Sequence, residues 1–209
     1  MGNRDYKQSG ENSYFHVYNR GNAKNNIFID NEDFELFILK INQNLFPDMY
    51  RPKRLYSAPI PDGSFSMISY CLMPNHFHFL IRQNGDITIS KLILKVYTGY
   101  SKYFNKKYNR VGHVFQDQFK QVLVDDDDYL RWLSVYIHQN PKVAMLVSNL
   151  ADYRWSSYTD YINGSGGLVS CDKEIILSQF DSLNEYSRFL SEGYEVIKSK
   201  KREENIFLD

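Results

Sequence analysis

The chain has 209 residues, enough for one domain with a sizeable core and too few for two large independent domains. Its 25 basic and 25 acidic residues give a formal net charge of zero, which excludes a global positive field that would draw the whole molecule to nucleic acid. Two cysteines, Cys71 and Cys171, are too few for a disulfide framework, and no stretch approaches the roughly 18 apolar residues of a membrane span. We therefore expect a cytoplasmic protein with no membrane partner.

The first half of the chain is predicted to form a strand, a helix and two further strands. Residues 14–19 alternate between apolar and polar side chains, as a strand does. Asp30 or Asn31 can cap a helix whose apolar stripe ends at Leu45. The proline-rich residues 47–63 form a long loop, and the strands at 64–71 and 76–81 follow it, joined by a turn near Pro74.

His76 and His78 lie in an apolar run and carry the first functional signal. Side chains alternate along a strand, so both imidazoles lie on one face while Phe77, Phe79 and Ile81 lie on the other. Two imidazoles on one face can bind a metal ion, provided that other residues complete the site. Without such partners they are two hydrogen-bonded histidines of a half-buried strand.

Residues 89–107 have the clearest helical periodicity in the chain. A second stripe on this helix is basic, and Arg110 follows it. Its lysines are Lys91, Lys95, Lys102 and Lys106. A solvated helix face explains such a stripe, but the absence of interleaved acidic residues also fits contact with phosphates.

The next elements are a strand at 114–124 and a second helix. Asp125 to Asp128 suit a helix N-terminus better than a metal site. The helix they open is expected to end before Pro141, and on it Trp132, Tyr136 and Asn140 are spaced by four residues and share a face. We expect a domain at 1–163 and, after a glycine-rich linker, a helical extension at 164–209.

Together these residues suggest a phosphodiester chemistry. A phenol has a pKa near about 10, so it needs a strongly activated electrophile, such as a phosphate bound to a metal ion. Histidine nitrogens with an amide oxygen suit Mg²⁺ or Mn²⁺, and Zn²⁺ less well. The constellation of His76, His78, Tyr136 and Asn140 therefore predicts a cation site beside a tyrosine nucleophile.

Three motifs in order resemble the REP-associated tyrosine transposases, a group of single-strand transposases with a His-hydrophobic-His motif and one catalytic tyrosine. They are LMPNHFHFLI at 72–81, GHVFQDQFK at 112–120 and YIHQNP at 136–141, and the likeness extends over about residues 14–161. The resemblance implies an α+β fold with a ferredoxin-like antiparallel sheet and packed helices, here followed by the C-terminal helical appendage.

The resemblance also implies a metal-dependent single-stranded DNA endonuclease and transposase, acting next to hairpins in the nucleoid. Tyr136 would form a 5′-phosphotyrosine bond, His76 and His78 would bind Mg²⁺ or Mn²⁺, and Asn140 would be the third ligand, with Gln139 as its rival. The basic residues from Lys91 to Arg110 would contact hairpin phosphates. Whether the protein forms a homodimer stays open.

Several alternatives stay open from the sequence. The protein could be a metal-dependent phosphodiester hydrolase that forms no adduct, or a DNA-binding protein that has lost cleavage. Tyr97 is a rival nucleophile, since it lies off the apolar stripe of its helix. His113 could approach the metal or contact DNA, whereas His16 and His138 are expected to be structural or surface residues.

Overall fold

The structure is a computed structural model that describes residues 12–50, 58–164 and 166–203. A four-stranded sheet in the order β2-β3-β1-β4 forms its centre, and every neighbouring pair of strands is antiparallel. The strands are β1 (Ser13–Arg20), β2 (Phe65–Met73), β3 (His76–Gln83) and β4 (Lys120–Val124). Residues 51–57 of the predicted loop at 47–63 and residues 204–209 of the predicted extension lie outside the described residues.

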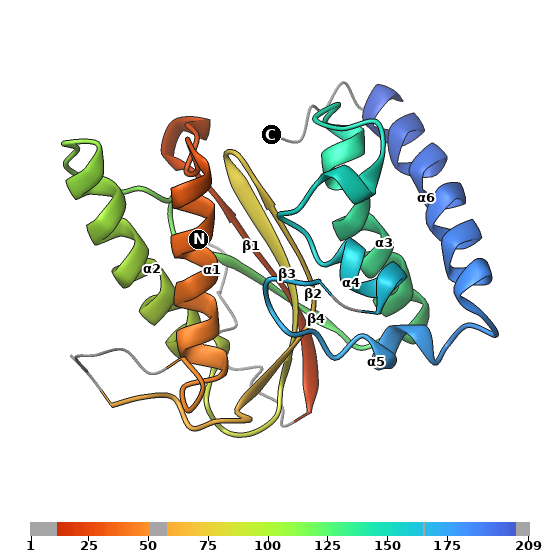
Figure 1. Ribbon diagram of the computed structural model, residues 1–209, viewed down its shortest axis with the longest axis horizontal. Helices are drawn as coiled ribbons and strands as arrows, with labels where there is room; N and C mark the ends of the chain where they lie inside the picture. The colour runs from red at the N-terminus through yellow and green to blue at the C-terminus, as the bar shows by residue number, and fades with distance from the viewer. Residues whose placement is uncertain (1–11, 51–57, 165, 204–209) are drawn as a thin grey trace, which may run out of the picture.

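Helices cover both faces of this sheet (Figure 1). One layer holds α1 (Asn31–Leu45) and α2 (Ile89–Lys107). The other holds α3 (Asp127–Val143), α4 (Tyr158–Asn163), α5 (Glu174–Leu177) and α6 (Leu183–Glu203). Two short 3-10 turns, η1 (Asn22–Lys24) and η2 (Leu150–Asp152), complete the described elements. The order β1-α1-β2-β3-α2-β4 confirms the predicted α+β, ferredoxin-like fold.

Strand alternation assigns the two faces of the sheet different chemistry. Phe77 and Phe79 point toward α1, where the Phe37 ring lies 5.5 Å and 6.3 Å from theirs between centroids. This face holds part of the apolar core, which removes large aromatic surfaces from water. His76 and His78 take the opposite face, toward α3, as the alternation predicts.

Side chains cap two of these helices as the sequence indicates. Asp30 accepts a hydrogen bond from the Asp33 backbone N–H, and the Asp33 side chain accepts one from the Asp30 N–H, which is a capping box at the start of α1. Asp126 accepts from the Tyr129 N–H at 2.7 Å and opens α3. The acidic run at 125–128 is exposed and serves this helix start.

Two predicted boundaries are wrong. The predicted strand at 114–124 is only Lys120–Val124, because Gly112 and Asp117 adopt positive φ angles and turn the chain before it. The predicted stop before Pro141 is also absent, since α3 continues to Val143. Proline cannot donate to the Ile137 carbonyl, and the Asn140 side-chain amide instead lies 3.5 Å from that oxygen and 2.8 Å from the Tyr136 carbonyl.

The C-terminal extension packs against α3. Tyr186 and Leu190 of α6 are buried, and the Tyr186 hydroxyl lies 2.8 Å from Nδ1 of His138 on α3. Nε2 of His138 lies 2.8 Å from the Ser157 hydroxyl, which in turn accepts from the Tyr70 N–H of β2. This buried polar network joins α6, α3 and the edge of the sheet.

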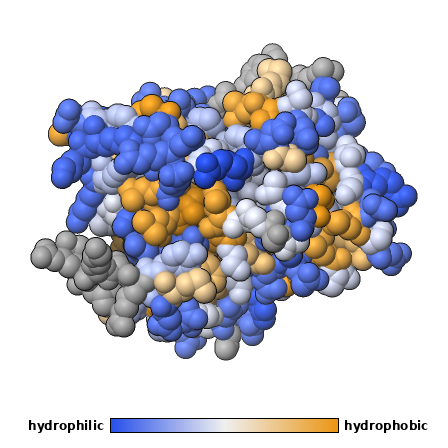
Figure 2. Space-filling model, in the orientation of Figure 1, coloured by the Kyte–Doolittle hydropathy of each residue, from blue (hydrophilic) through white to orange (hydrophobic). Residues whose placement is uncertain are grey.

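Polar side chains cover most of the face shown in Figure 2, apart from one apolar area beside α1 and another beside α6. Among the described residues, no helix is both long and apolar enough to cross a membrane.

Candidate active site

A cleft of about 570 Å³ opens between the sheet and α3. β1 and β3 form its floor, α3 forms one wall, and the loop before β4 forms the other. The side chains that the argument uses are His16, Arg20, His76, His78, Lys120 and Tyr136. The register explains their convergence, because Tyr18 pairs with His78 and Arg20 pairs with His76. Alternate residues of two neighbouring strands therefore face the same cleft.

Each of the paired histidines has a hydrogen-bond partner on its Nδ1 atom. Nδ1 of His76 lies 2.6 Å from Oδ1 of Asn75, and Nδ1 of His78 lies 2.9 Å from Nε2 of His16. The two rings are 5.1 Å apart between centroids and nearly perpendicular. His78 is only 6% exposed, so its ring is held within the wall of the cleft.

Gly21 keeps the turn before His76 close to the end of β1. Its N–H donates to the Asn75 carbonyl at 2.7 Å. A Cβ at this position would lie 2.0 Å from the Asn25 carbonyl oxygen, so no larger residue fits without a backbone shift. The glycine thus helps to fix the place of Asn75 and His76 relative to β1.

Tyr136 projects from α3 toward the histidines. Its ring meets His78 edge-on at 5.4 Å between centroids and His16 at 6.3 Å. Burial raises the pKa of Tyr136 to about 12, with smaller contributions from Tyr18, Tyr129 and Cys71. The phenol is therefore neutral at ordinary pH, and it needs help to lose its proton when it attacks an electrophile.

Asn140 and Gln139 differ in where they point. Gln139 is 1% exposed, and its Nε2 donates to the Leu190 carbonyl of α6, away from the cleft. Asn140 follows Tyr136 by one helical turn, but its amide donates to carbonyls of its own helix and it does not line the cleft. Asn140 has to rotate its side chain before its oxygen can reach an ion beside the histidines.

The donor chemistry of the cleft fits a divalent cation. With Nδ1 of both histidines already bonded, the atom that each can present to an ion is Nε2. Among the described residues, no group of three or more His, Cys, Asp or Glu side chains is placed to hold a metal. An ion bound by His76 and His78 would therefore take its further ligands from amide oxygens, substrate or water.

The cations of the cleft were not predicted. Two of them, Arg20 and Lys120, line the cleft. Nε of Arg20 donates to Oε1 of Gln116 at 2.6 Å, and Nζ of Lys120 lies 5.7 Å from the Tyr18 ring centroid. Arg20 pairs with His76 across β1 and β3, and the sequence alone does not predict which residues of the two strands pair. His16 was expected to be a structural or surface residue, and the structure places it in the lining of the cleft, where burial lowers its pKa to about 4.

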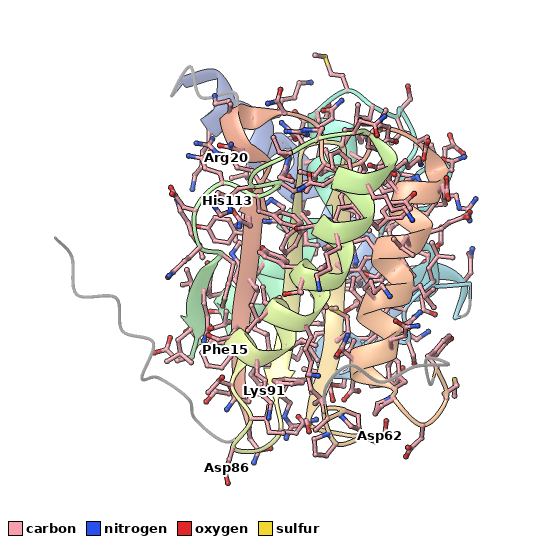
Figure 3. All side chains as sticks on the ribbon, turned by 90° about the vertical axis from the view of Figure 1, so that its left-hand side faces the viewer. Phe15, Arg20, Asp62, Asp86, Lys91 and His113 are labelled. Atoms are coloured by element: carbon pink, nitrogen blue, oxygen red, sulfur yellow. The ribbon has the colours of Figure 1, made fainter. Side chains whose placement is uncertain are left out.

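The basic stripe of α2 lies on the other face of the sheet from α3 (Figure 1). In Figure 3, Lys91 lies at one end of the molecule, and Arg20 and His113 lie at the other. Lys91, Lys102 and Lys106 are exposed, and Lys95 donates to the Ala58 carbonyl at 2.7 Å. Arg110 lies over the Phe104 ring at 5.4 Å. The stripe is thus outside the cleft.

The remaining candidates lie away from the cleft or serve the core. Tyr97 stacks on Phe115 at 4.0 Å between centroids and meets Phe77 on the α2 side of the sheet, and burial raises its pKa well above the usual value. His113 lines a smaller hollow next to Tyr97. His138 is buried in the network described above, as a structural role requires.

The fold and the site thus combine a ferredoxin-like sheet and a His-x-His strand that faces a tyrosine on a neighbouring helix. The family model described as "Transposase IS200 like" matches residues 12–140, and the chain belongs to this family. No curated protein matches the chain.

One solved structure supports this fold, and a second is similar at a lower level. A REP-associated tyrosine transposase bound to a REP hairpin is similar with a TM-score of 0.56 and 15% sequence identity, over 83% of this chain and 96% of that one. A candidate transposase from Deinococcus radiodurans R1 is 10% identical over 66% of this chain and 95% of that one, with a TM-score of 0.39. The first likeness bears out the fold that the sequence motifs suggested.

Proposed function

We propose that this protein cleaves and rejoins single-stranded DNA through a covalent bond between Tyr136 and a 5′-phosphate. The observation that carries the proposal is the placement of Tyr136, whose ring meets His78 at 5.4 Å inside a cleft large enough for a nucleotide backbone. The family supports DNA as the substrate. The tyrosine, the histidines and the cations of the cleft face one another, as a phosphoryl transfer requires.

The chemical step exchanges one ester for another. The phenolic oxygen of Tyr136 forms a bond to phosphorus, and the bond from phosphorus to the 3′ oxygen breaks. The proton that the phenol loses is balanced by the proton that the departing oxygen gains as a 3′-hydroxyl. Attack by a 3′-hydroxyl on the phosphotyrosine reverses these changes, which rejoins a strand without any external energy source.

His76 and His78 would hold the divalent cation of this reaction, Mg²⁺ or Mn²⁺. Such an ion, when bound, offsets negative charge on the phosphate and favours loss of the phenolic proton. Asn140 is the proposed third ligand, because Gln139 is committed to α6. Its ligating atom would be Oδ1, because an amide NH₂ group only donates hydrogen bonds, and the side chain would first have to leave the Tyr136 carbonyl.

The phosphates of the DNA strand would contact the basic side chains of the cleft and of α2. Arg20 and Lys120 would contact phosphates next to the cleavage site, because both line the cleft. The stripe of α2 would contact a flanking hairpin at a distance from the cleft. Its proposed DNA-binding residues are Lys91, Lys95, Lys102, Lys106 and Arg110. The structure bound to a REP hairpin supports hairpin DNA as the partner.

The C-terminal extension would brace the helix that carries the nucleophile. We place the catalytic domain at 1–163 and the extension at 164–209, and the contacts of Tyr186 and Leu190 with α3 give the extension this role. An extension that binds His138 and Gln139 restrains the rotation of α3, on which Tyr136 lies two residues before His138.

The test is incubation of the protein with end-labelled single-stranded DNA that carries a hairpin, in the presence of Mn²⁺. We expect a denaturation-resistant protein–DNA species, and peptide mapping should place the nucleotide on Tyr136. Cleavage without an adduct would indicate a metal-dependent hydrolase. Binding without cleavage on any hairpin substrate would indicate a DNA-binding protein that has lost its chemistry. Either result would overturn the proposal.

A further inference from the structure

His16 makes a buried hydrogen bond to one of the paired histidines. It lies on β1, is 7% exposed, and its Nε2 is 2.9 Å from Nδ1 of His78 on β3. The planes of the two rings differ by only 23°, with 5.2 Å between centroids, and Tyr18 stacks on both rings, at 4.6 Å from His16 and 5.6 Å from His78. The hydrogen bond and the stacking together restrict both the position and the plane of the His78 ring.

This hydrogen bond has one arrangement of protons that suits a metal ligand. A neutral imidazole carries its proton on one nitrogen and accepts with the other. If His78 binds an ion through Nε2, its proton lies on Nδ1 and is donated to Nε2 of His16. If His16 donated instead, the proton of His78 would lie on Nε2, the atom that has to face the ion. The pair thus links the tautomer of His78 to its capacity to bind a cation.

His76 shows the same arrangement with a partner that can only accept. Its Nδ1 lies 2.6 Å from Oδ1 of Asn75, and a carbonyl oxygen has no proton to donate. Nδ1 of His76 therefore carries the proton and Nε2 has the lone pair. The two strand histidines present the same nitrogen when His16 accepts from His78, which gives an ion two equivalent ligands.

We propose that His16 is a positioning residue for the cation site, which fixes Nε2 of His78 as the ligating atom and holds the ring in place. This inference rests on the metal-dependent function proposed above. His16 acts through His78, and it is not itself a ligand, since the described residues contain no group of three such side chains placed around an ion. Partners of this kind affect metal affinity by about 10–100-fold in other proteins.

The test measures Mn²⁺ binding to the DNA-free protein by titration calorimetry and by the electron paramagnetic resonance signal of unbound Mn²⁺. His16→Phe keeps an aromatic ring but cannot accept the hydrogen bond from Nδ1 of His78, and we expect the Mn²⁺ affinity of this variant to fall about 10–100-fold. His16→Gln, whose amide oxygen can accept from Nδ1 of His78, should recover most of that loss. His113→Gln is the matched control, because His113 is exposed outside the cleft, and its affinity should equal that of the wild type.

A second readout reports the tautomer without any metal. Long-range ¹⁵N–¹H spectra of the histidine-labelled wild type should show the proton of His78 on Nδ1. A proton on Nε2 would overturn the inference. Thermal melts of each variant show whether it is folded, and the spectrum of the wild type keeps the inference testable if His16→Phe does not fold.

The outcomes separate this inference from the proposed function. Equal Mn²⁺ affinity of the wild type and a folded His16→Phe would overturn the role of His16 and leave the metal site intact. A wild type that binds no Mn²⁺, with or without DNA, would instead overturn the metal dependence on which the inference rests.

Discussion

Replacing Tyr136 with Phe should abolish chemistry and leave the fold and the DNA affinity almost unchanged. No hydrogen bond of the Tyr136 hydroxyl occurs among the described residues, so the substitution breaks none of them. The ring keeps its edge-on contacts with His78 and His16. We therefore expect the free energy of unfolding to change by less than about 0.5 kcal/mol at neutral pH. Adduct and cleavage should both disappear, because the attacking oxygen is missing.

The same substitution should also change the response of stability to alkali. Burial raises the pKa of Tyr136 to about 12 in the folded protein, against about 10 for an unfolded chain. The unfolded chain therefore loses this proton first, and stability falls as pH rises from about 10 to about 12. One pH unit in this window corresponds to about 1.4 kcal/mol. Between pH 8 and pH 11, Tyr136→Phe should lose about 1.4 kcal/mol less stability than the wild type.

Two assays check these outcomes. Urea unfolding at pH 8 and pH 11, followed by circular dichroism, gives the stabilities, and gel analysis of labelled DNA gives cleavage and adduct. Tyr129→Phe is the matched control, because Tyr129 lines the same cleft but is 38% exposed. Cleavage by Tyr136→Phe at the wild-type rate, or an adduct mapped to Tyr18, Tyr97 or Tyr129, would refute the reasoning.

Three further outcomes follow from the site and its supports. Arg20→Gln should weaken binding of single-stranded DNA and reduce the slope of log affinity against log salt by about 0.7, and an unchanged slope would remove Arg20 from the DNA path. Gly21→Ala should lower the stability by about 1–3 kcal/mol or more in urea unfolding, whereas Gly85→Ala, whose Cβ meets nothing within 4 Å, should stay within about 0.5 kcal/mol. His138→Leu should lower the free energy of unfolding by about 2–4 kcal/mol, because the hydroxyls of Tyr186 and Ser157 each lose a buried hydrogen-bond partner. A smaller loss would contradict the network.

Local periodicity accounts for the parts that the sequence predicted well. The alternation of His76 and His78 with Phe77 and Phe79 separates a polar face from an aromatic one, and the structure has this separation. The cap at Asp30 follows from side-chain chemistry within four residues of the helix start. Such features depend on neighbours in the chain, so a single sequence contains them.

The errors and omissions depend on distant residues or on unusual local geometry. The strand predicted at 114–124 begins only at Lys120, after the positive φ angle of Asp117. The helix continues past Pro141, where the Asn140 side-chain amide lies 3.5 Å from the one carbonyl, that of Ile137, which proline leaves without a backbone donor. Arg20 lies beside the histidines because β1 pairs with β3 in one particular register, and sequence periodicity does not predict this register.

The contacts between α3 and α6 affect when α3 can fold during synthesis on the ribosome. His138 and Gln139 are buried on α3, and their partners, the Tyr186 hydroxyl and the Leu190 carbonyl, are made about 50 residues later. At about 5–20 residues per second, an emerging chain spends several seconds with these polar groups without partners, each costing about 1–3 kcal/mol if buried. We therefore expect the part of α3 next to Tyr136 to become ordered only after α6 has been made.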